Sequence, residues 1–292
     1  MKKTNFLGII ILLFFFLSTF FFQGACKQET ASSILYVGGD GPGNYSSIHN
    51  AINQAAGGSI IFVYDGTYFE NLTIEKPLHV TGENKNTTII NGSGNKFVVT
   101  LAANHIVISG FTITNSEKKF PYAGIYVNSD SNTISDNILT NNYYGIHLGY
   151  EARDNLIVNN TIFHNRQCGI YFNHASYNRL IGNIVSNHPV NGFGLYEFSN
   201  DNRIINNTFS LNRYTGVNIR ESYQNQVIGN TFIKDEVGMH KPSPEYQTVS
   251  RDNIFNDNGL SLEEERDAII LTVIAFDILV FFAFLVFRKM TI

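Results

Sequence analysis

Short units of alternating apolar and polar residues recur along the middle of this chain. Each unit reads Asn, any residue, aliphatic, two residues, Asn, any residue, then aliphatic or Phe. Its copies begin at Asn132, Asn155, Asn178, Asn202 and Asn225, so the period is 23 or 24 residues, and a partial sixth copy begins at Asn253. Repetition at such a period predicts a solenoid, in which each repeat is one coil that contacts only its neighbours.

The residues of the repeat predict β-strands rather than helices. Its apolar segments, such as Asn-Leu-Ile-Val, are short, rich in β-branched residues and interrupted by Asn and Gly. Helical repeats need amphipathic runs of about ten residues or more. Alternation with turn residues every few positions predicts three short strands per coil, and stacked coils would pair these strands into parallel sheets.

Stacking places equivalent apolar residues in three inward columns. The first column is Ile134, Ile157, Leu180, Ile204 and Val227. The second is Leu139, Ile162, Val185, Phe209 and Phe232. The third follows a recurrent glycine and contains Ile125, Ile146, Ile170, Leu195 and Val217. These glycines are expected to have positive φ or to allow close backbone approach. In one coil Gly192 fits the glycine position as well as Gly194 does, and that choice would change the column locally.

Asparagines recur where the chain is expected to turn. One such column is Asn137, Asn160, Asn183, Asn207 and Asn230. Asparagine tolerates left-handed backbone, and its amide can bond the turn backbone and the next asparagine in the stack. We interpret these residues as scaffold rather than as ligands.

An outward column also follows from the third strand of each coil. It consists of the residues two positions after each recurrent glycine: Tyr126, His147, Tyr171, Tyr196, Asn218 and His240. Flat side chains with polar tips in a row suit a sugar chain, which would stack on the rings and bond to their tips. The competing interpretation is that exposed strand positions favour Tyr and that stacked rings stabilise the sheet. Tyr126, His147, Tyr171 and Tyr196 are the carbohydrate-binding candidates.

Both ends of the chain carry long apolar runs. Residues 1–25 combine Lys2 and Lys3 with an apolar run and small residues before Cys26, which predicts a secretory signal, with lipidation of Cys26 or a retained anchor as alternatives. A linker would follow at 26–33, and the β-helix domain would span 34–258. After a juxtamembrane segment at 259–267, residues 268–287 are long enough to span a bilayer.

The flanks of that span predict its orientation. The tail, residues 288–292, begins with a basic pair and predicts a cytoplasmic C-terminus with the solenoid outside. Asp277 within the span would be a contact for a partner helix or ion, or a lone neutral carboxyl group.

Composition narrows the functional classes. The 292 residues carry a net charge of −4 and show no basic stripe, so we expect no nucleic-acid partner. Cys26 and Cys168 are the two cysteines, and their positions support neither a disulfide framework nor a cysteine metal site. No motif predicts a cofactor.

The first hundred residues complete the solenoid. Residues 34–56 predict a strand, a glycine-rich loop and a short helix capped by Ser46 or Ser47, which would cover the open end of the stack. The segments 57–71, 74–83, 88–92 and 106–113 then resemble the N-terminal coils of secreted β-helix proteins of the pectate-lyase-like superfamily.

The later Asn- and Gly-rich coils resemble the repeats of the NosD type, a periplasmic copper-binding accessory protein. The resemblance covers residues 34–258. It implies an all-β fold, a right-handed single-stranded parallel β-helix, to which the segments described above add an N-terminal helical cap and a C-terminal transmembrane helix. For function it implies less, because this fold serves lyases, hydrolases, epimerases, adhesins and accessory proteins.

The candidate chemistry is sparse. The Asp- and His-containing motifs of related galacturonan hydrolases are absent, and Glu151 and Glu221 would lie three coils apart. We assign no catalytic residue; Glu197 is the one acid to test, because it would displace an apolar inward position. We assign no metal ligand either; His164 and His188 form the one candidate pair, at nearly equivalent positions of adjacent coils, without a third ligand.

Three functions remain open at this point. The first is a membrane-anchored extracytoplasmic protein that binds polysaccharide or forms part of the envelope without catalysis. The second is a carbohydrate-active enzyme, a lyase, hydrolase or epimerase. The third is a NosD-like accessory factor in the maturation of a copper enzyme. Two carboxylates in one groove would favour the second, and a histidine cluster would favour the third.

Overall fold

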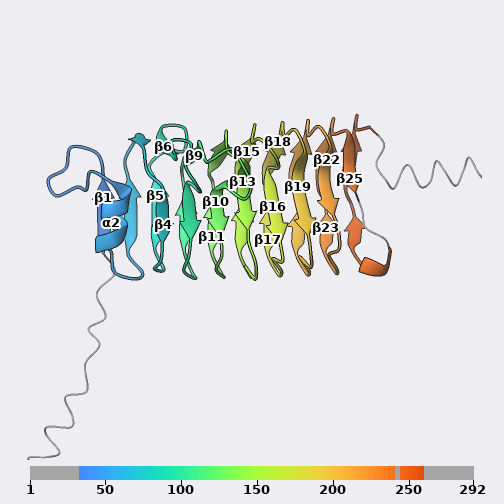
Figure 1. The fold of residues 1–292 in the computed structure, drawn as a ribbon, viewed down its shortest axis with the longest axis horizontal. Helices are drawn as coiled ribbons and strands as arrows, with labels where there is room; N and C mark the ends of the chain where they lie inside the picture. The colour runs from blue at the N-terminus through green and yellow to red at the C-terminus, as the bar shows by residue number, and fades with distance from the viewer. Residues whose placement is uncertain (1–32, 241–243, 260–292) are drawn as a thin grey trace, which may run out of the picture. The chain divides into compact units, whose positions relative to one another are not determined.

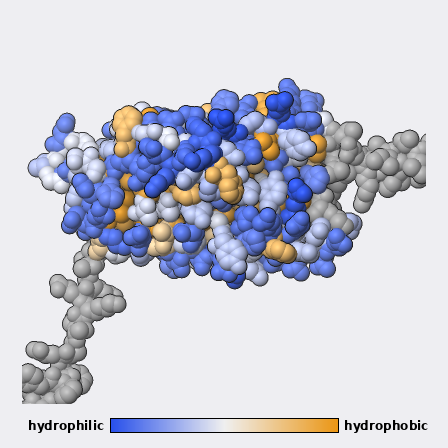
Figure 2. Space-filling model, viewed as in Figure 1, coloured by the Kyte–Doolittle hydropathy of each residue, from blue (hydrophilic) through white to orange (hydrophobic). Residues whose placement is uncertain are grey.

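The computed structural model describes residues 33–240 and 244–259, and within them the chain winds as a right-handed stack of coils (Figure 1). Three parallel sheets run along the stack, with ten, nine and eight strands, and each coil contributes one strand to each sheet it reaches. The face of the stack shown in Figure 2 is mostly hydrophilic with scattered apolar residues, because the inward side chains pack inside the coils.

The strands are short, and each sheet takes every third strand or nearly so. Sheet A contains β1 (Ile34–Val37), β2 (Ile60–Val63), β5 (His79–Gly82), β8 (Val107–Ser109), β11 (Thr133–Ser135), β14 (Leu156–Val158), β17 (Arg179–Ile181), β20 (Arg203–Ile205), β23 (Gln226–Ile228) and β26 (Val249–Arg251). Sheet B contains β3 (Gly66–Tyr68), β6 (Thr88–Asn91), β9 (Thr112–Thr114), β12 (Ile138–Thr140), β15 (Thr161–Phe163), β18 (Ile184–Ser186), β21 (Thr208–Ser210), β24 (Thr231–Ile233) and β27 (Ile254–Asn256). Sheet C contains β4 (Leu72–Ile74), β7 (Val99–Leu101), β10 (Ala123–Val127), β13 (Tyr144–Leu148), β16 (Ile170–Asn173), β19 (Asn191–Tyr196), β22 (Thr215–Ile219) and β25 (Val237–His240).

Two of the three predicted inward columns are confirmed and the third needs one correction. The first column lies in sheet A and the second in sheet B, with every member paired to its equivalent and fully buried. In sheet C, Phe193 rather than Leu195 pairs with Ile170 and Val217. The glycine of this coil is therefore Gly192. The prediction was wrong because this repeat has one residue more than the 23-residue repeats, and the additional residue lies after β19 and not before it.

The recurrent glycines are explained by close approach. A Cβ on Gly145 would lie 2.4 Å from the carbonyl oxygen of Gly169, and one on Gly192 would lie 2.7 Å from that of Gly216. Such distances leave no room for a side chain, so only glycine lets the coils meet at this corner.

Asparagines form hydrogen-bonded columns at the corners, as predicted. Ladder 1 contains Asn132, Asn155, Asn178, Asn202 and Asn225, and ladder 2 contains Asn137, Asn160, Asn183, Asn207, Asn230 and Asn253. In a typical step, the backbone N–H and Nδ2 of Asn183 both donate to Oδ1 of Asn207, each at 2.9 Å. Nδ2 of Asn207 then donates to the carbonyl oxygen of Leu180 at 3.0 Å. Each buried amide therefore links three segments of backbone.

A third ladder escaped the sequence analysis. Ladder 3 runs along the corner before sheet C and contains Asn142, Asn165, His188, Asn212, Asp235 and Asn258. It resembles the other two except that His188 and Asp235 stand where asparagine is the rule.

One helix packs at the N-terminal end of the stack. Helix α2 (Ile48–Gln54) begins after Ser47, whose hydroxyl accepts a hydrogen bond from the backbone N–H of Asn50 at 3.2 Å. Ile48, Ala51 and Ile52 are buried against β1, β2 and β4. The predicted helical cap amounts to this single helix. Near the other end, a short 3₁₀ helix, η1 (Pro244–Tyr246), precedes β26.

Several predictions fall outside the described residues. They are the secretory signal at 1–25, the fate of Cys26, the anchor at 268–287 with Asp277, and the tail at 288–292. Within 33–240 and 244–259, no helix is long and apolar enough to cross a bilayer.

Candidate functional site

The predicted aromatic column lies on the outer face of sheet C, with one change. Tyr126 pairs with His147, and His147 pairs with Tyr171. The next member is Gly194 and not Tyr196, because Tyr196 pairs with Asn173. Gly194 leaves the column without a side chain at that level.

The ring of Tyr196 occupies the space above Gly194. A Cβ on Gly194 would lie 2.3 Å from Cε2 of Tyr196, so the ring covers this glycine closely. The Tyr196 hydroxyl accepts a hydrogen bond from Nδ2 of Asn191 at 2.7 Å, and the Tyr196 ring centroid is 5.4 Å from that of Tyr171. The aromatic track is therefore continuous although the register differs from the prediction.

Tyr144, which the sequence analysis missed, belongs to the same surface. Its ring stacks on that of Tyr171 with centroids 4.6 Å apart and planes at 10°. It lies at the start of β13, where the equivalent residues of neighbouring coils are Ala123, Cys168 and Asn191. A column of such mixed residue types gives no repeating signal.

His147 lies in the floor of this surface and not at its exposed rim. Its side chain is 6 % exposed and contacts Tyr126 and Tyr171 edge-on, with ring centroids 5.1 and 5.0 Å away. Nδ1 donates to the carbonyl oxygen of Pro121 at 3.0 Å, since that oxygen can only accept. Burial lowers the pKa of His147 to about 4, so the imidazole is neutral near pH 7.

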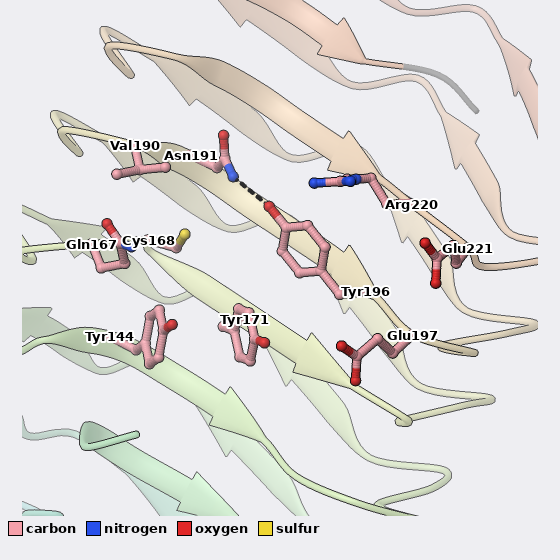
Figure 3. Close-up of a pocket in the computed structure, with 10 residues that line it drawn as sticks. All are labelled: Tyr144, Gln167, Cys168, Tyr171, Val190, Asn191, Tyr196, Glu197, Arg220 and Glu221. Atoms are coloured by element: carbon pink, nitrogen blue, oxygen red, sulfur yellow. Dashed lines mark hydrogen bonds between the residues drawn. The ribbon is translucent and has the colours of Figure 1, made fainter. Parts of the chain in front are cut away.

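A groove with a volume of about 310 Å³ crosses this face (Figure 3). Tyr144, Tyr171 and Tyr196 lie along it, and three charged side chains stand toward the ends of their strands. The full lining is Tyr144, Gln167, Cys168, Tyr171, Val190, Asn191, Tyr196, Glu197, Arg220 and Glu221. Of the four predicted carbohydrate contacts, the groove includes Tyr171 and Tyr196 but neither Tyr126 nor His147.

The polar groups of the groove floor are neutral. Burial raises the pKa of Tyr144, Tyr171 and Tyr196, so their hydroxyls stay protonated and can both donate and accept hydrogen bonds. Burial also raises the pKa of the Cys168 thiol to about 12, which leaves too little thiolate for a nucleophile. The hydroxyl and thiol groups of the floor are therefore neutral near pH 7.

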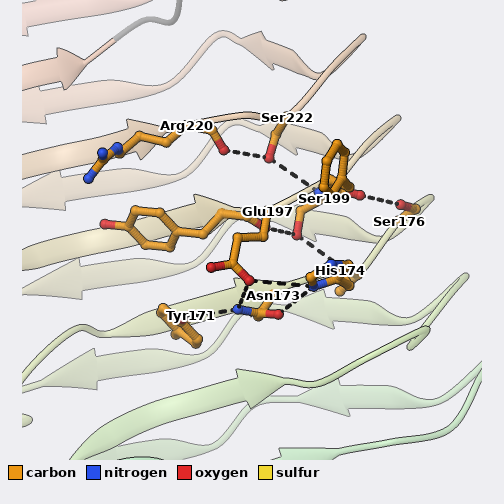
Figure 4. Close-up of polar contacts among 11 residues, drawn as sticks. Tyr171, Asn173, His174, Ser176, Glu197, Ser199, Arg220 and Ser222 are labelled. Carbon is orange, nitrogen blue, oxygen red and sulfur yellow. Dashed lines mark hydrogen bonds and ion pairs between the residues drawn. The ribbon is translucent and has the colours of Figure 1, made fainter.

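Glu197 lies at the rim and is not an inward residue, contrary to the prediction. Its side chain is 57 % exposed and its φ is +47°, at the turn that follows β19. Oε2 accepts a hydrogen bond from Nδ2 of Asn173 at 3.1 Å and lies 3.7 Å from Nδ1 of His174 (Figure 4). The same Asn173 amide reaches the hydroxyl of Tyr171 at 3.3 Å, so the rim and the floor are connected.

Glu221 stands beside Glu197 and not beside Glu151. The backbone N–H of Phe198 donates to the carbonyl oxygen of Glu221 at 2.8 Å, which places Glu197 and Glu221 on adjacent coils. Both line the groove together with Arg220, which directly precedes Glu221 in the chain. Sequence reasoning missed this pair because it set Glu197 in the wrong register.

His164 and His188 are not equivalent. His188 occupies ladder 3 next to Asn165, whereas His164 is an exposed turn residue with φ of +51°. Nε2 of His188 lies 3.2 Å from Nδ2 of Asn165, and Nδ1 lies 2.9 Å from Oδ1 of Asn212, so both ring nitrogens are already bonded. Throughout the described ranges, no three His, Cys, Asp or Glu side chains are grouped to hold a metal ion.

The fold defines the class of protein, a right-handed parallel β-helix, and solved structures share it. The structure of pectate lyase Pel9A matches with a TM-score of 0.62 at 16 % identity, over 79 % of this chain and 77 % of that chain. Pectin methylesterase from Aspergillus niger matches with a TM-score of 0.51 at 16 % identity, over 79 % and 87 %. Identities this low establish a shared fold and nothing finer.

The family is shown by sequence. The family model described as "Periplasmic copper-binding protein (NosD)" matches residues 50–271, and the chain belongs to this family. Among curated proteins, the probable pectinesterase/pectinesterase inhibitor 6 of Arabidopsis thaliana is 28 % identical over 123 residues, which is 36 % of this chain and 22 % of that protein. The aligned part is thus about a fifth of that relative's length.

The described residues do not fit the copper in the family's description. Copper sites need grouped His, Met or Cys ligands. His188 is fully engaged in ladder 3, Cys168 is a buried thiol, and Met239 is 2 % exposed inside the stack. In the described part of the chain, both ring nitrogens of His188 are already hydrogen-bonded and no three His, Cys, Asp or Glu side chains are grouped, so these residues offer no copper site.

Proposed function

We propose that this chain is an extracytoplasmic protein that binds a polysaccharide in the groove on the outer face of sheet C. The observation that carries the proposal is the groove floor, where the rings of Tyr144, Tyr171 and Tyr196 lie along adjacent coils with neutral hydroxyls. A pyranose ring has an apolar face that stacks on such rings and hydroxyls that bond to their tips.

Other observations support the location and the ligand class. The family description names a periplasmic protein, and the pattern of residues 1–25 predicts export. The names of the structural relatives, a pectate lyase and a pectin methylesterase, refer to polysaccharide substrates. A membrane anchor at 268–287 remains part of the proposal.

Binding to a glycan microarray tests the proposal directly. The full-length chain should bind one or more polysaccharides, and Tyr171→Ala/Tyr196→Ala should weaken this binding about tenfold, since each ring contact contributes about 0.5–1.5 kcal/mol. Tyr36→Ala is the matched control, because Tyr36 is an exposed tyrosine on sheet A. A wild-type chain that binds no glycan, or a double variant that binds as well as wild type, would contradict the proposal.

A second candidate is a carbohydrate-active enzyme, favoured by the Glu197–Glu221 pair beside Arg220. Glycoside hydrolysis uses two carboxyl groups that face one groove. Both glutamates are exposed, however, whereas the general acid of such enzymes usually lies against apolar groups. Product analysis on every bound polysaccharide separates the two functions. Turnover that Glu197→Gln or Glu221→Gln abolishes, with binding retained, would establish the enzyme.

A further inference from the structure

A second cleft, here called the corner cleft, lies beside the groove at the turns that lead from sheet C to sheet A. It has a volume of about 280 Å³ and is formed by the turns of three consecutive coils. Its rings come from Tyr150, His174, Tyr177 and Phe198, and its charges from Glu151, Arg153 and Asp201. The polysaccharide-binding function proposed for the groove gives this cleft no role.

Three large rings are exposed around the corner cleft. Tyr150 is 67 % exposed, Tyr177 is 52 % exposed and Phe198 is 55 % exposed. Exposed aromatic groups gathered at one place usually mark a binding surface. Their rings do not stack face to face on His174. The centroid of the His174 ring lies 5.1 Å from that of Tyr150, with the ring planes at 42°, and 5.7 Å from that of Phe198, with the planes at 48°. Tilted contacts of this kind leave part of each ring face open.

Two of these aromatic residues also have a strained backbone. Tyr177 has φ of +61° and Phe198 has φ of +58°, a region that bulky residues rarely adopt. In the next two coils the turn position of Tyr177 is taken by Asp201 and Gln224. Asp154, Asp201 and Gln224 have the same left-handed backbone at this position, so the turn sets the positive φ but does not require a ring at Tyr177.

The corner cleft also carries charges that the fold leaves unpaired. Within the described part of the chain, the side chains of Arg153 and Asp201 make no hydrogen bond and no ion pair. A guanidinium group and a carboxylate beside open rings suit a ligand that has an apolar face and several hydroxyls at its edge.

Hydrogen bonds between coils hold the walls of the corner cleft in place without a ligand. The backbone N–H of Asn200 donates to Oγ of Ser176 at 3.0 Å, and the backbone N–H of Tyr223 donates to Oδ1 of Asn200 at 2.7 Å. These bonds connect the second and third coils of the cleft and join the third to the coil that follows. The backbone N–H of Glu151 donates to the carbonyl oxygen of His174 at 3.0 Å, which connects the first coil of the cleft to the second. A ligand would therefore meet a rigid frame and lose little affinity to ordering it.

The corner cleft and the groove are connected at one point. Glu197 lines the groove, His174 lines the corner cleft, and their side chains approach to 3.7 Å (Figure 4). Both follow the stack from coil to coil, and the corner cleft lies to one side of the groove over the same coils. A polymer in the groove would reach the corner cleft with a side residue and not with its main chain.

We propose that the corner cleft binds a single sugar residue that branches from the polysaccharide in the groove. Its apolar face stacks on Tyr150 or Phe198, and its hydroxyls bond to Arg153 and Asp201. This inference rests on the proposed function and adds a ligand class to it, a branched glycan.

The test compares linear and branched glycans. A microarray carrying linear oligosaccharides and their singly branched counterparts is probed with the full-length chain, with Tyr150→Ala/Phe198→Ala, and with Tyr171→Ala/Tyr196→Ala. The wild type should prefer branched ligands, and Tyr150→Ala/Phe198→Ala should lose that preference, about tenfold, while binding linear ligands as before. Phe69→Ala, which removes an equally exposed ring elsewhere, is the control.

Every other outcome contradicts this inference, the proposed function, or both. If Tyr150→Ala/Phe198→Ala binds every glycan as the wild type does, the corner cleft binds no sugar, and the function proposed for the groove is unaffected. If Tyr150→Ala/Phe198→Ala loses affinity equally for linear and branched ligands, with an unchanged unfolding temperature, the corner cleft does not bind a branch. If the wild type shows no preference for branched ligands, the inference that the cleft binds a branch is likewise contradicted. Failure of the wild type to bind any glycan removes both the proposed function and this inference.

Discussion

Ladders 1 and 2 are built from asparagine alone, whereas ladder 3 contains His188 and Asp235. The comparison shows what a ladder position requires: a side chain that accepts hydrogen bonds from one coil and donates to another. A primary amide does this at every pH. Histidine does it only as a neutral ring, with Nε2 toward Asn165 and the Nδ1 proton toward Asn212. Aspartate does it only when protonated.

Asp235 shows the misfit in its hydrogen bonds. Its Oδ1 accepts from the backbone N–H and Nδ2 of Asn212 at 2.8 and 2.9 Å. Its Oδ2 is buried without a partner, at the place where asparagine would present its donating Nδ2. The groups that face it are the amides of Asn212 and Asn258 and the backbone of Gly216, and none of them is charged. Burial accordingly raises the pKa of Asp235 to about 7.

Breaking a pure ladder should have the largest effect on stability. Asn207→Ala removes the acceptor of two donors of Asn183 and the donor to Leu180, all of them buried. Each orphaned group costs about 1–3 kcal/mol, so we expect a loss of about 3 kcal/mol or more in the free energy of unfolding. Urea denaturation measures it. The exposed neighbour Arg203→Ala should change stability by less than about 0.5 kcal/mol, and an equal loss there would contradict the role of the ladder.

Repairing ladder 3 at Asp235 should have the next largest effect, and only at high pH. A carboxyl pKa raised from 3.8 to about 7 means that the folded state loses stability as pH rises from about 4 to 7 and stays low above that. Asp235→Asn should therefore be more stable than wild type by about 3 kcal/mol at pH 8.5, with the difference shrinking toward pH 4. Urea midpoints across this range test it. Asp154→Asn, at an exposed turn, should show no such trend.

Repairing the ladder at His188 should give a smaller effect of opposite sign in pH. Burial lowers the pKa of His188 from 6.5 to about 4, so wild-type stability falls as pH decreases through this range. His188→Asn should be more stable than wild type by about 1–2 kcal/mol at pH 4.5, because the smaller side chain offsets part of the gain. Near pH 7.5 the gain should vanish or reverse. A pH-independent difference would show that size and not charge distinguishes this position.

The double variant sharpens the comparison further. In the wild type the two slopes oppose each other between about pH 4 and 6.5, so each single variant uncovers the slope of the other residue. His188→Asn/Asp235→Asn should remove both contributions, and its stability should vary less with pH than that of either single variant. A remaining slope would have to come from groups outside ladder 3.

The sequence predicted the fold because its repeats encode stacking directly. Matching residues such as Ile134 and Ile157 are neighbours in space, so a period in the sequence becomes a column in the structure. The error in the inward columns, Leu195 for Phe193, arose where two glycines stand two residues apart. Both choices keep the same strand face inward, so alternation alone could not decide between them.

The candidate site was less predictable for a related reason. Tyr171 follows from the repeat, but Tyr144 and Glu221 enter the groove at positions where equivalent residues differ from coil to coil. The ring of Tyr196 reaches the groove by leaning over Gly194, which is a matter of side-chain packing and not of register. Such contacts depend on which neighbour leaves space, and one sequence does not show that space.

The stacking of like coils also bears on how such a protein could change over generations. A coil contacts only the coil before it and the coil after it, and the hydrogen-bond pattern of the corners is the same at almost every level. Duplicating one 23-residue unit would therefore extend the platform by about 4.8 Å without a new kind of contact. The length of this surface would then be inherited as a number of coils.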